Sequence, residues 1–197
     1  MLKLHTTRGL VLIISIFAMV AGCRDQADSA PPAPVKPLEM LSVDGVGPLN
    51  AKTPFNLHLL TDAFQAFNVT QQTNFVGGNQ YPVITVSKDL KPVLTINPDA
   101  KHEKIFSVMV QDNLIGNQLG HPLGSKFSDI YAYGKTEKCA AGSEELSGKV
   151  LCYAPKAVNI LYLFSGSWNG AKGQVPPKDV LANWNLESIL WKPLPRK

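Results

Sequence analysis

The chain has 197 residues, a formal net charge of +4 at pH 7 and 45% hydrophobic residues, a composition that is ordinary for a globular protein. Residues 1–22 carry two of the cations, Lys3 and Arg8, and no acidic residue, so the remaining 175 residues carry a formal charge of only +2. A charge this small argues against nucleic-acid binding and against polybasic membrane binding, and the length suits one domain with its own core.

The first 22 residues have the pattern of an export signal. The two cations near the start precede an apolar run, LVLIISIFAMV at residues 10–20, and two small residues, Ala21 and Gly22, follow it. This order is typical of a secretory signal, and the apolar run is shorter than the roughly 20 residues that a membrane-spanning helix needs. We therefore expect residues 1–22 to be removed on export.

The tetrapeptide Val20-Ala21-Gly22-Cys23 resembles the lipobox of bacterial lipoproteins. The resemblance implies that the chain is cut before Cys23, that a diacylglyceryl group is attached to the cysteine, and that the new amine is acylated. Each buried CH₂ group contributes about 0.8 kcal/mol, so several acyl chains give durable anchoring. The alternative is a plain signal with a chance cysteine at the cut.

The residue after the cysteine bears on sorting between the two membranes. Arg24 stands where lipoproteins of enteric bacteria that stay at the inner membrane usually carry Asp, although Asp25 follows it. We therefore expect the protein at the periplasmic face of the outer membrane, with the inner membrane as the alternative.

Residues 24–37, RDQADSAPPAPVKP, have the composition of a tether. The segment holds four prolines and too few large apolar residues to order itself, and Pro-rich linkers extend at about 3.1 Å per residue. We expect three parts: a lipoprotein signal peptide at residues 1–22, a lipid-anchored Pro-rich tether at 23–40 and one globular domain at 41–197.

Short β-strands dominate the pattern of that domain. The candidate strands are rich in β-branched and aromatic residues and are bounded by Gly, Pro, Asn or Asp. In chain order they cover residues 69–76, 81–86, 93–96, 105–110, 150–153, 158–164 and 186–191. A Gly-Gly-Asn turn at residues 77–79 joins the first two.

Three short helices are expected between the strands. The first opens at Thr53-Pro54, a cap residue followed by proline at the first helical position, and runs to residue 64. The second opens near Ser125 and covers 126–133, and the third follows Pro176-Pro177 and covers 178–184. The predicted fold is therefore mainly β with a few short helices (α+β), with antiparallel sheets in a sandwich-like arrangement.

Cys139 and Cys152 are the cysteines that follow Cys23 in the chain. Export would place them where disulfides form and persist. The segment between them, AAGSEELSGKVL, is rich in turn formers, so we expect a hairpin with a structural disulfide near its base. The alternatives are a redox pair, which usually has the spacing Cys-x-x-Cys, and half of a metal site.

No set of residues with catalytic spacing stands out. His58, His102 and His121 have no second His or Cys at metal-ligand spacing, so we expect neither a metal nor a cofactor. Ser165 and Ser167 follow a strand but lack the Gly-x-Ser-x-Gly pattern, and no phosphate-binding or dinucleotide fingerprint appears. We therefore expect no enzyme; the alternative is a hydrolase that uses Ser165 or Ser167 with His102 or His121.

Three tryptophans are candidates for a binding surface. Tryptophan is enriched at interfaces, although at strand ends it is more often part of the core. Trp168 is the strongest candidate, because the segment SGSWNG at residues 165–170 predicts an exposed loop. The candidate binding surface consists of Trp168, Asn169 and Trp184.

Several separated blocks of the sequence, in one order, resemble the sigma-E-regulated, YfeY-like lipoprotein family of Gram-negative bacteria. They are FSDIY at 127–131, Cys139 and Cys152, FSGSWNG at 164–170, NW at 183–184 and ILW at 189–191. The resemblance spans residues 42–191 and implies a mainly β, sandwich-like domain on a lipid anchor, connected with envelope stress. It carries over no catalytic residue, because the family has none assigned.

The sequence thus favours a lipid-anchored periplasmic protein with a non-enzymatic binding or structural role. Its expected partners are the membrane, through the acyl chains, and an envelope protein or lipid, and not nucleic acid. Besides the envelope hydrolase, the alternative is an assembly factor or chaperone for envelope components, for which exposed edge strands or an apolar groove are expected.

Overall fold

The computed structural model describes residues 36–194, apart from residues 77, 132–137 and 172. The chain divides into two units, residues 1–33 and 34–197, and the described residues all belong to the second. The expected signal, Cys23 and most of the expected tether lie outside them. No helix among the described residues is long and apolar enough to cross a membrane.

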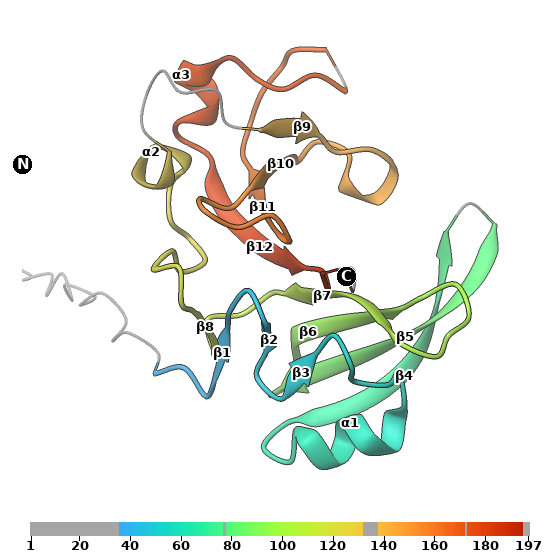
Figure 1. Cartoon of the computed structure of the whole chain (residues 1–197). Coiled ribbons are helices and arrows are strands. Elements are labelled where there is room, and N and C mark those ends of the chain that lie inside the picture. The colour runs from blue at the N-terminus through green and yellow to red at the C-terminus, as the bar shows by residue number, and fades with distance from the viewer. Residues whose placement is uncertain (1–35, 77, 132–137, 172, 195–197) are drawn as a thin grey trace, which may run out of the picture. The chain divides into compact units, whose positions relative to one another are not determined.

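Eight strands form one antiparallel sheet, in the order β4-β5-β6-β7-β12-β11-β10-β9 (Figure 1). Neighbours in the chain pair as hairpins, except that the last strand, β12, inserts between β7 and β11. The strands are β4 (Asn68–Val76), β5 (Asn79–Lys88), β6 (Lys91–Pro98), β7 (Ile105–Val110), β9 (Cys139–Ala141), β10 (Val150–Tyr153), β11 (Ile160–Ser165) and β12 (Asn185–Trp191).

A second sheet has four very short strands in the order β3-β2-β1-β8. They are β1 (Glu39–Leu41), β2 (Gly45–Val46), β3 (Leu49–Asn50) and β8 (Ile115–Asn117). The pairing of β1 with β8 is parallel, whereas antiparallel sheets were predicted. β1 also includes residues 39–40, which the sequence assigned to the tether.

The core lies between the two sheets, and this confirms the predicted mainly β, sandwich-like fold. Alternate side chains of the large sheet face inward, as the period of two in a strand requires. One row of directly opposed, buried residues crosses six strands: Val86, Leu94, Val110, Ile189, Tyr162 and Cys152. The small sheet adds Leu41, Val46 and Leu49 to the same cluster. Full burial contributes about 1.5–3 kcal/mol for each large apolar side chain.

Helix α1 (Leu57–Ala63) begins three residues later than predicted. Its cap is Asn56, whose side chain accepts a hydrogen bond from the backbone N–H of Leu59 at 3.0 Å. Thr53 is therefore not the cap; its hydroxyl accepts a hydrogen bond from the backbone N–H of Asn50 at 3.0 Å instead. The prediction was wrong in detail because two cap-type side chains, three residues apart, competed for one helix start.

The other two helices are single turns, shorter than predicted. Helix α2 (Phe127–Ile130) ends where Tyr131 adopts an extended conformation, and α3 (Lys178–Leu181) stops before the expected residue 184. A 3₁₀ turn at Glu144–Leu146, which the sequence did not predict, lies between the two cysteines. β11 begins two residues later than predicted, because Val158 is exposed.

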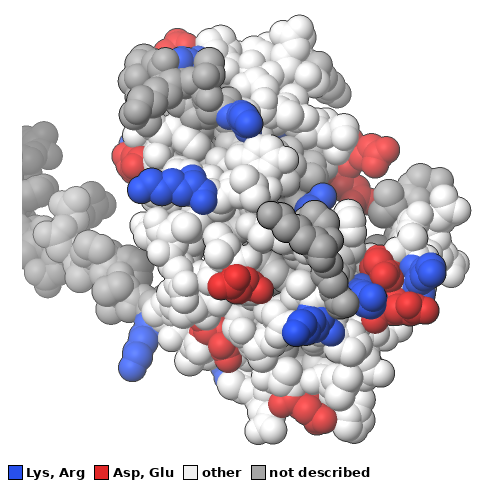
Figure 2. Space-filling model, viewed as in Figure 1, with Lys and Arg blue, Asp and Glu red and all other residues white. Residues whose placement is uncertain are grey.

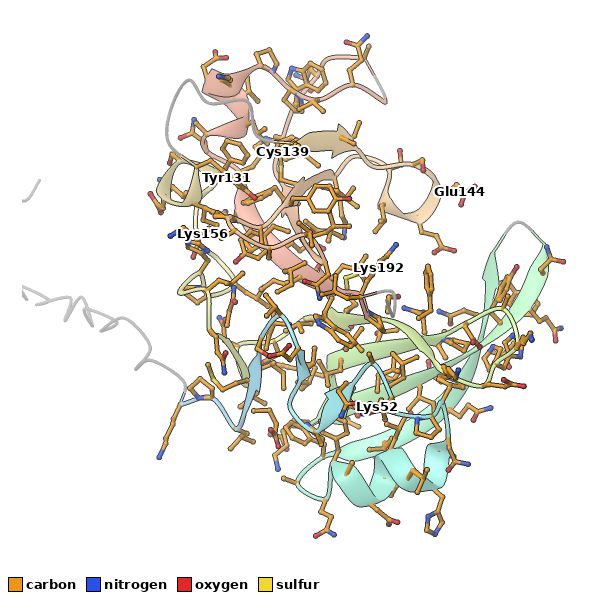
Figure 3. All side chains as sticks on the ribbon, in the orientation of Figure 1. Lys52, Tyr131, Cys139, Glu144, Lys156 and Lys192 are labelled. Atoms are coloured by element: carbon orange, nitrogen blue, oxygen red, sulfur yellow. A yellow bond between two sulfur atoms is a disulfide. The ribbon has the colours of Figure 1, made fainter. Side chains whose placement is uncertain are left out.

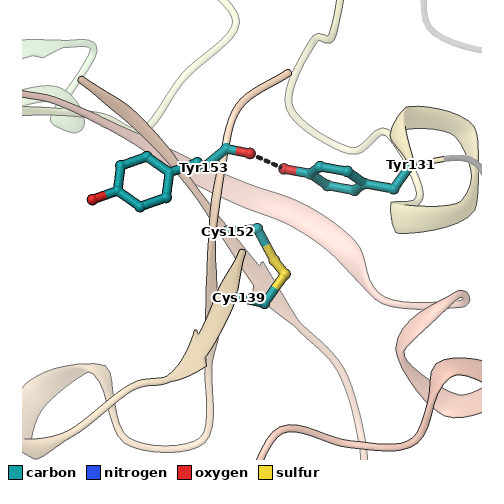
Figure 4. The surroundings of a disulfide bond; sticks show 4 residues. All are labelled: Tyr131, Cys139, Cys152 and Tyr153. Atoms are coloured by element: carbon teal, nitrogen blue, oxygen red, sulfur yellow. Dashed lines mark hydrogen bonds between the residues drawn. A yellow bond between two sulfur atoms is a disulfide. The ribbon is translucent and has the colours of Figure 1, made fainter. Parts of the chain in front are cut away.

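The disulfide between Cys139 and Cys152 is confirmed. The two residues are directly opposite each other on β9 and β10, and Cys152 is fully buried in the core (Figure 4). Beside the bridge, the Tyr131 hydroxyl donates a hydrogen bond to the Tyr153 carbonyl oxygen at 2.7 Å. The disulfide therefore ties β9, an edge strand of the large sheet, to the core.

Replacing both cysteines by alanine should lower the free energy of unfolding. The bridge joins residues 13 apart in sequence, and closing a loop of that length stabilises a fold by roughly 3 kcal/mol. Urea unfolding of the double variant should show a lower midpoint than a Cys23→Ser control, in which the bridge remains. Equal unfolding free energies would contradict the structural role of the disulfide.

Candidate functional site

The three residues of the expected binding surface differ in burial. Trp184 follows α3 and is only 5% exposed, so it belongs largely to the core. Trp168 lies in the loop between β11 and α3, is half-buried and packs against the same cluster. Asn169 is exposed beside it. The structure therefore brings the two tryptophans to one region, and only Trp168 is at the surface to a substantial degree.

Two glycines explain how the indoles are held. A Cβ atom placed on Gly166 would clash with the ring of Trp184, and one placed on Gly170 would clash with the ring of Trp168. Each indole thus packs directly against backbone that only glycine leaves uncovered. Each of the two glycines in the Ser-Gly-Ser-Trp-Asn-Gly segment is therefore in contact with one indole ring.

Both indoles line a pocket of about 410 Å³, which we call the tryptophan pocket. One wall comes from the β9–β10 hairpin, at residues 141–142 and 147–150, and the other from residues 166, 168, 170, 171, 173 and 174 of the loop that follows β11. Asn169 does not line it. Figure 3 shows Tyr131 and Cys139 at the same end of the sheet as α3, with Glu144 in the neighbouring loop. The lining combines glycine backbone, two aromatic rings and a few polar side chains.

The indole nitrogen of Trp184 is unusual. Among the described residues, it is the one buried side-chain nitrogen or oxygen atom without a hydrogen-bond partner. Leaving such a donor unsatisfied costs about 1–3 kcal/mol. Trp184 lines the tryptophan pocket, but the nitrogen itself is covered: it packs against Gly166, where a Cβ atom would lie 2.5 Å from it.

The charged group of the pocket is already neutralised. Lys149, which directly precedes β10, forms an ion pair with Glu187 of β12. Burial raises the pKa of Glu187, but hydrogen bonds from Lys149 and Ser165 outweigh it and leave the pKa lower than usual. On the face of the molecule shown in Figure 2, basic and acidic side chains are likewise interspersed. The pocket therefore presents little net charge.

The serines and histidines that a hydrolase would use lie in different parts of the structure. Ser165 is hydrogen-bonded to the Glu187 carboxylate, and Ser167 is exposed. His102 is exposed in a turn between β6 and β7, and His121 contacts Tyr162. Among the described residues, neither serine forms a hydrogen bond with a histidine, and no group of three or more His, Cys, Asp or Glu side chains could hold a metal ion.

A partly buried polar cluster joins the two sheets, and no sequence pattern predicted it. The Tyr162 hydroxyl of β11 accepts a hydrogen bond from the Asn117 side chain of β8 at 2.8 Å and lies 3.0 Å from Nδ1 of His121. The hydroxyl donates to Nδ1 in the tautomer that leaves Nδ1 unprotonated, and accepts from it in the other tautomer. Burial lowers the pKa of His121 and raises the pKa of Tyr162 to about 12.

A second hollow, of about 440 Å³, lies on the outer face of β4, β5 and β6. Its lining is mostly uncharged amide and hydroxyl side chains: Asn68, Thr70, Gln72, Asn74, Thr85, Ser87, Thr95 and Gln111. It holds no aromatic side chain, so the tryptophan pocket is the better candidate for a binding site.

Comparisons with known proteins match most of the described chain. The family model described as "Protein of unknown function (DUF1131)" matches residues 35–193. The uncharacterized protein YfeY of Escherichia coli (strain K12) is 32% identical over 155 residues, which cover 77% of this chain and 78% of that protein. The crystal structure of the uncharacterized protein yfeY from Escherichia coli aligns with a TM-score of 0.66 and 30% identity, over 78% of this chain and 99% of that one.

Replacing Gly166 by alanine should destabilise the protein through the Trp184 ring. The new methyl group must displace the indole, and overpacking of this kind costs about 1–3 kcal/mol. Near-ultraviolet circular dichroism should change together with the unfolding midpoint. In the matched Gly120→Ala control, the methyl group enters open space and only the positive φ is strained, so the tryptophan signal should stay unchanged. Identical spectra for both variants would contradict the packing.

His121 should make stability depend on pH. Its pKa is below the ordinary 6.5 in the folded protein, so the unfolded chain binds a proton more readily than the folded one. The stability that the neutral ring supports is complete above about pH 6.5 and is lost as the pH falls toward the lowered pKa. Urea unfolding at about pH 7.5 and about pH 5.5 should show a larger loss for the wild type than for His121→Gln, which does not titrate. Equal losses would refute the burial of a neutral histidine.

Proposed function

Since the chain belongs to the DUF1131 family of proteins of unknown function, we propose that it is a non-enzymatic binding module of the bacterial envelope. In this proposal Cys23 carries acyl chains, the domain lies in the periplasm at the outer membrane, and the tryptophan pocket binds an extended segment of an envelope protein. The connection with envelope stress comes with the resemblance to the sigma-E-regulated lipoproteins.

The lining of the tryptophan pocket supports a peptide as its ligand. Gly148 and Gly173 line the pocket and have no atom within 4 Å of the position of a Cβ, so that another backbone can approach them closely. Trp168 offers a ring for an apolar side chain, and Trp184 adds a second aromatic residue to the lining. An acyl chain would instead require a deep and uniformly apolar cavity. The observation that carries the proposal is this pairing of two indoles with a glycine backbone around one pocket.

The positions of the serines and histidines support a non-enzymatic role over a hydrolase. A nucleophilic serine needs a base within hydrogen-bond reach. The group that Ser165 contacts is the carboxylate of Glu187, which is also paired with Lys149. His121 is held by the Tyr162 hydroxyl in the core cluster instead.

Affinity capture from detergent-solubilised envelope tests the pocket. The full-length protein should retain an envelope protein, and Trp168→Ala should reduce the amount retained by at least about tenfold, as expected for an aromatic hot spot. Trp168→Phe keeps an aromatic ring and should retain more. Phe106→Ala removes another exposed aromatic ring, on β7 outside the pocket, and serves as the control. Equal capture by the wild type and Trp168→Ala would reject the pocket as the binding site.

Metabolic labelling with radioactive palmitate tests the anchor separately. The wild-type chain should incorporate label and fractionate with the outer membrane, because acylation at Cys23 adds several buried hydrocarbon chains. Cys23→Ser should be unlabelled and should not partition with membranes. An unlabelled wild-type protein, or a Cys23→Ser variant that stays with the envelope, would contradict the anchor without affecting the pocket.

A further inference from the structure

Strand β4 is an open edge of the large sheet, and it lacks the usual protection. Proteins keep edge strands from pairing with other chains by making them short or by placing charged residues or prolines in them. β4 has nine residues, and the segment Asn68–Val76 contains neither a charged residue nor a proline. The remaining edge strands, β9, β3 and β8, have only two or three residues each.

The exposed part of β4 is the part farthest from helix α1. Residues 71–75 are all exposed, on both faces of the strand, and Phe75 is 65% exposed. The hairpin that β4 forms with β5 reaches to one side of the sheet (Figure 1). A strand of this kind offers both its backbone groups and its side chains to a second chain.

The register of the hairpin shows which backbone groups are available. Val76 is opposite Asn79, and the closing pair of a two-residue hairpin loop exchanges hydrogen bonds, after which bonded and non-bonded pairs alternate. The even-numbered residues of β4 therefore bond to β5. The N–H and C=O groups of Val69, Gln71, Thr73 and Phe75 point toward the open edge.

We propose that a second copy of this chain occupies that edge, with the two β4 strands antiparallel and the two-fold axis at Gln72. Antiparallel pairing of one edge with itself is a closed two-fold contact. In this register Val69 faces Phe75 of the second copy and Gln71 faces Thr73, so all the outward backbone groups are paired. The two eight-stranded sheets become one continuous sheet.

The side chains of β4 favour this register over its neighbours. Phe75 lies on the same face of the strand as Val69, which is half-buried and packs against the core cluster. Pairing at Gln72 therefore places the exposed ring beside an apolar residue that is already partly covered. Because β4 has no charged residue, two copies do not repel each other along this edge. This contact is independent of the tryptophan pocket.

Cysteine cross-linking in the full-length protein tests the register. At the two-fold axis the Gln72 residues form a non-hydrogen-bonded pair, with Cα atoms about 4.5 Å apart, within the range that a disulfide spans. Gln72→Cys should therefore give a disulfide-linked dimer in non-reducing electrophoresis of intact cells. In the matched Asn74→Cys control, on the same face, the two Cα atoms would be about 14 Å apart, which a disulfide cannot bridge. We expect at least about tenfold more dimer from Gln72→Cys. Equal yields, or a larger yield from Asn74→Cys, would overturn the proposal.

Charge pairs provide the second arm of the test, in the Gln72→Cys background. Gln71→Lys combined with Thr73→Lys places like charges opposite each other at both symmetry-related positions and should reduce the dimer to the level of the Asn74→Cys control. Gln71→Lys combined with Thr73→Glu places opposite charges there and should preserve it. Both positions are exposed, so neither variant disturbs the core. A dimer yield that is the same in the two variants would contradict pairing along β4.

Discussion

The pairing of β12 with β7 holds the large sheet together. The hairpins of β4 to β7 and those of β9 to β11 share no other strand pairing among the described residues, so β12 alone joins the two halves. Trp191 stands at this junction: it is opposite Val108 of β7 and opposite Ile160 of β11, and it is almost fully buried. Its indole N–H also donates a hydrogen bond to the carbonyl oxygen of Val43 at 3.1 Å, which brings the turn between β1 and β2 onto the large sheet. One side chain near the C-terminus thus connects both halves of the large sheet with the small sheet.

The tryptophan pocket depends on the same strand. The chain enters β12 directly from Trp184, and the backbone carbonyl of Trp184 accepts a hydrogen bond from Phe127 of α2 at 2.9 Å. The opposite wall belongs to the β9–β10 hairpin, which the disulfide ties to the core. The loop with Trp168 forms the other wall and packs on the Trp184 ring through Gly166, so the indoles are positioned before any ligand arrives. Preorganisation of this kind reduces the entropy lost on binding.

Local patterns predicted those parts of the fold that depend on local order. The strands at residues 105–110 and 150–153 match β7 and β10 residue by residue, because a run of β-branched and aromatic residues between turn formers is visible in one segment. The strands β1, β2, β3 and β8 have two or three residues each, too few to show a period, and partners distant in sequence define them. At the site, the glycines around Trp168 predicted an exposed loop. The burial of Trp184, and the contact of His121 with Tyr162 across 41 residues, arise from tertiary packing, which no local pattern encodes.

The most direct test of the binding role is site-specific photo-cross-linking in growing cells. A photoreactive phenylalanine analogue at position 168 would lie at the mouth of the tryptophan pocket, and the same analogue at position 106 would lie on exposed surface outside it. We expect a discrete adduct with an envelope protein from position 168 and none from position 106. No adduct from either position, or the same adduct from both, would contradict the claim that the domain works by binding through this pocket.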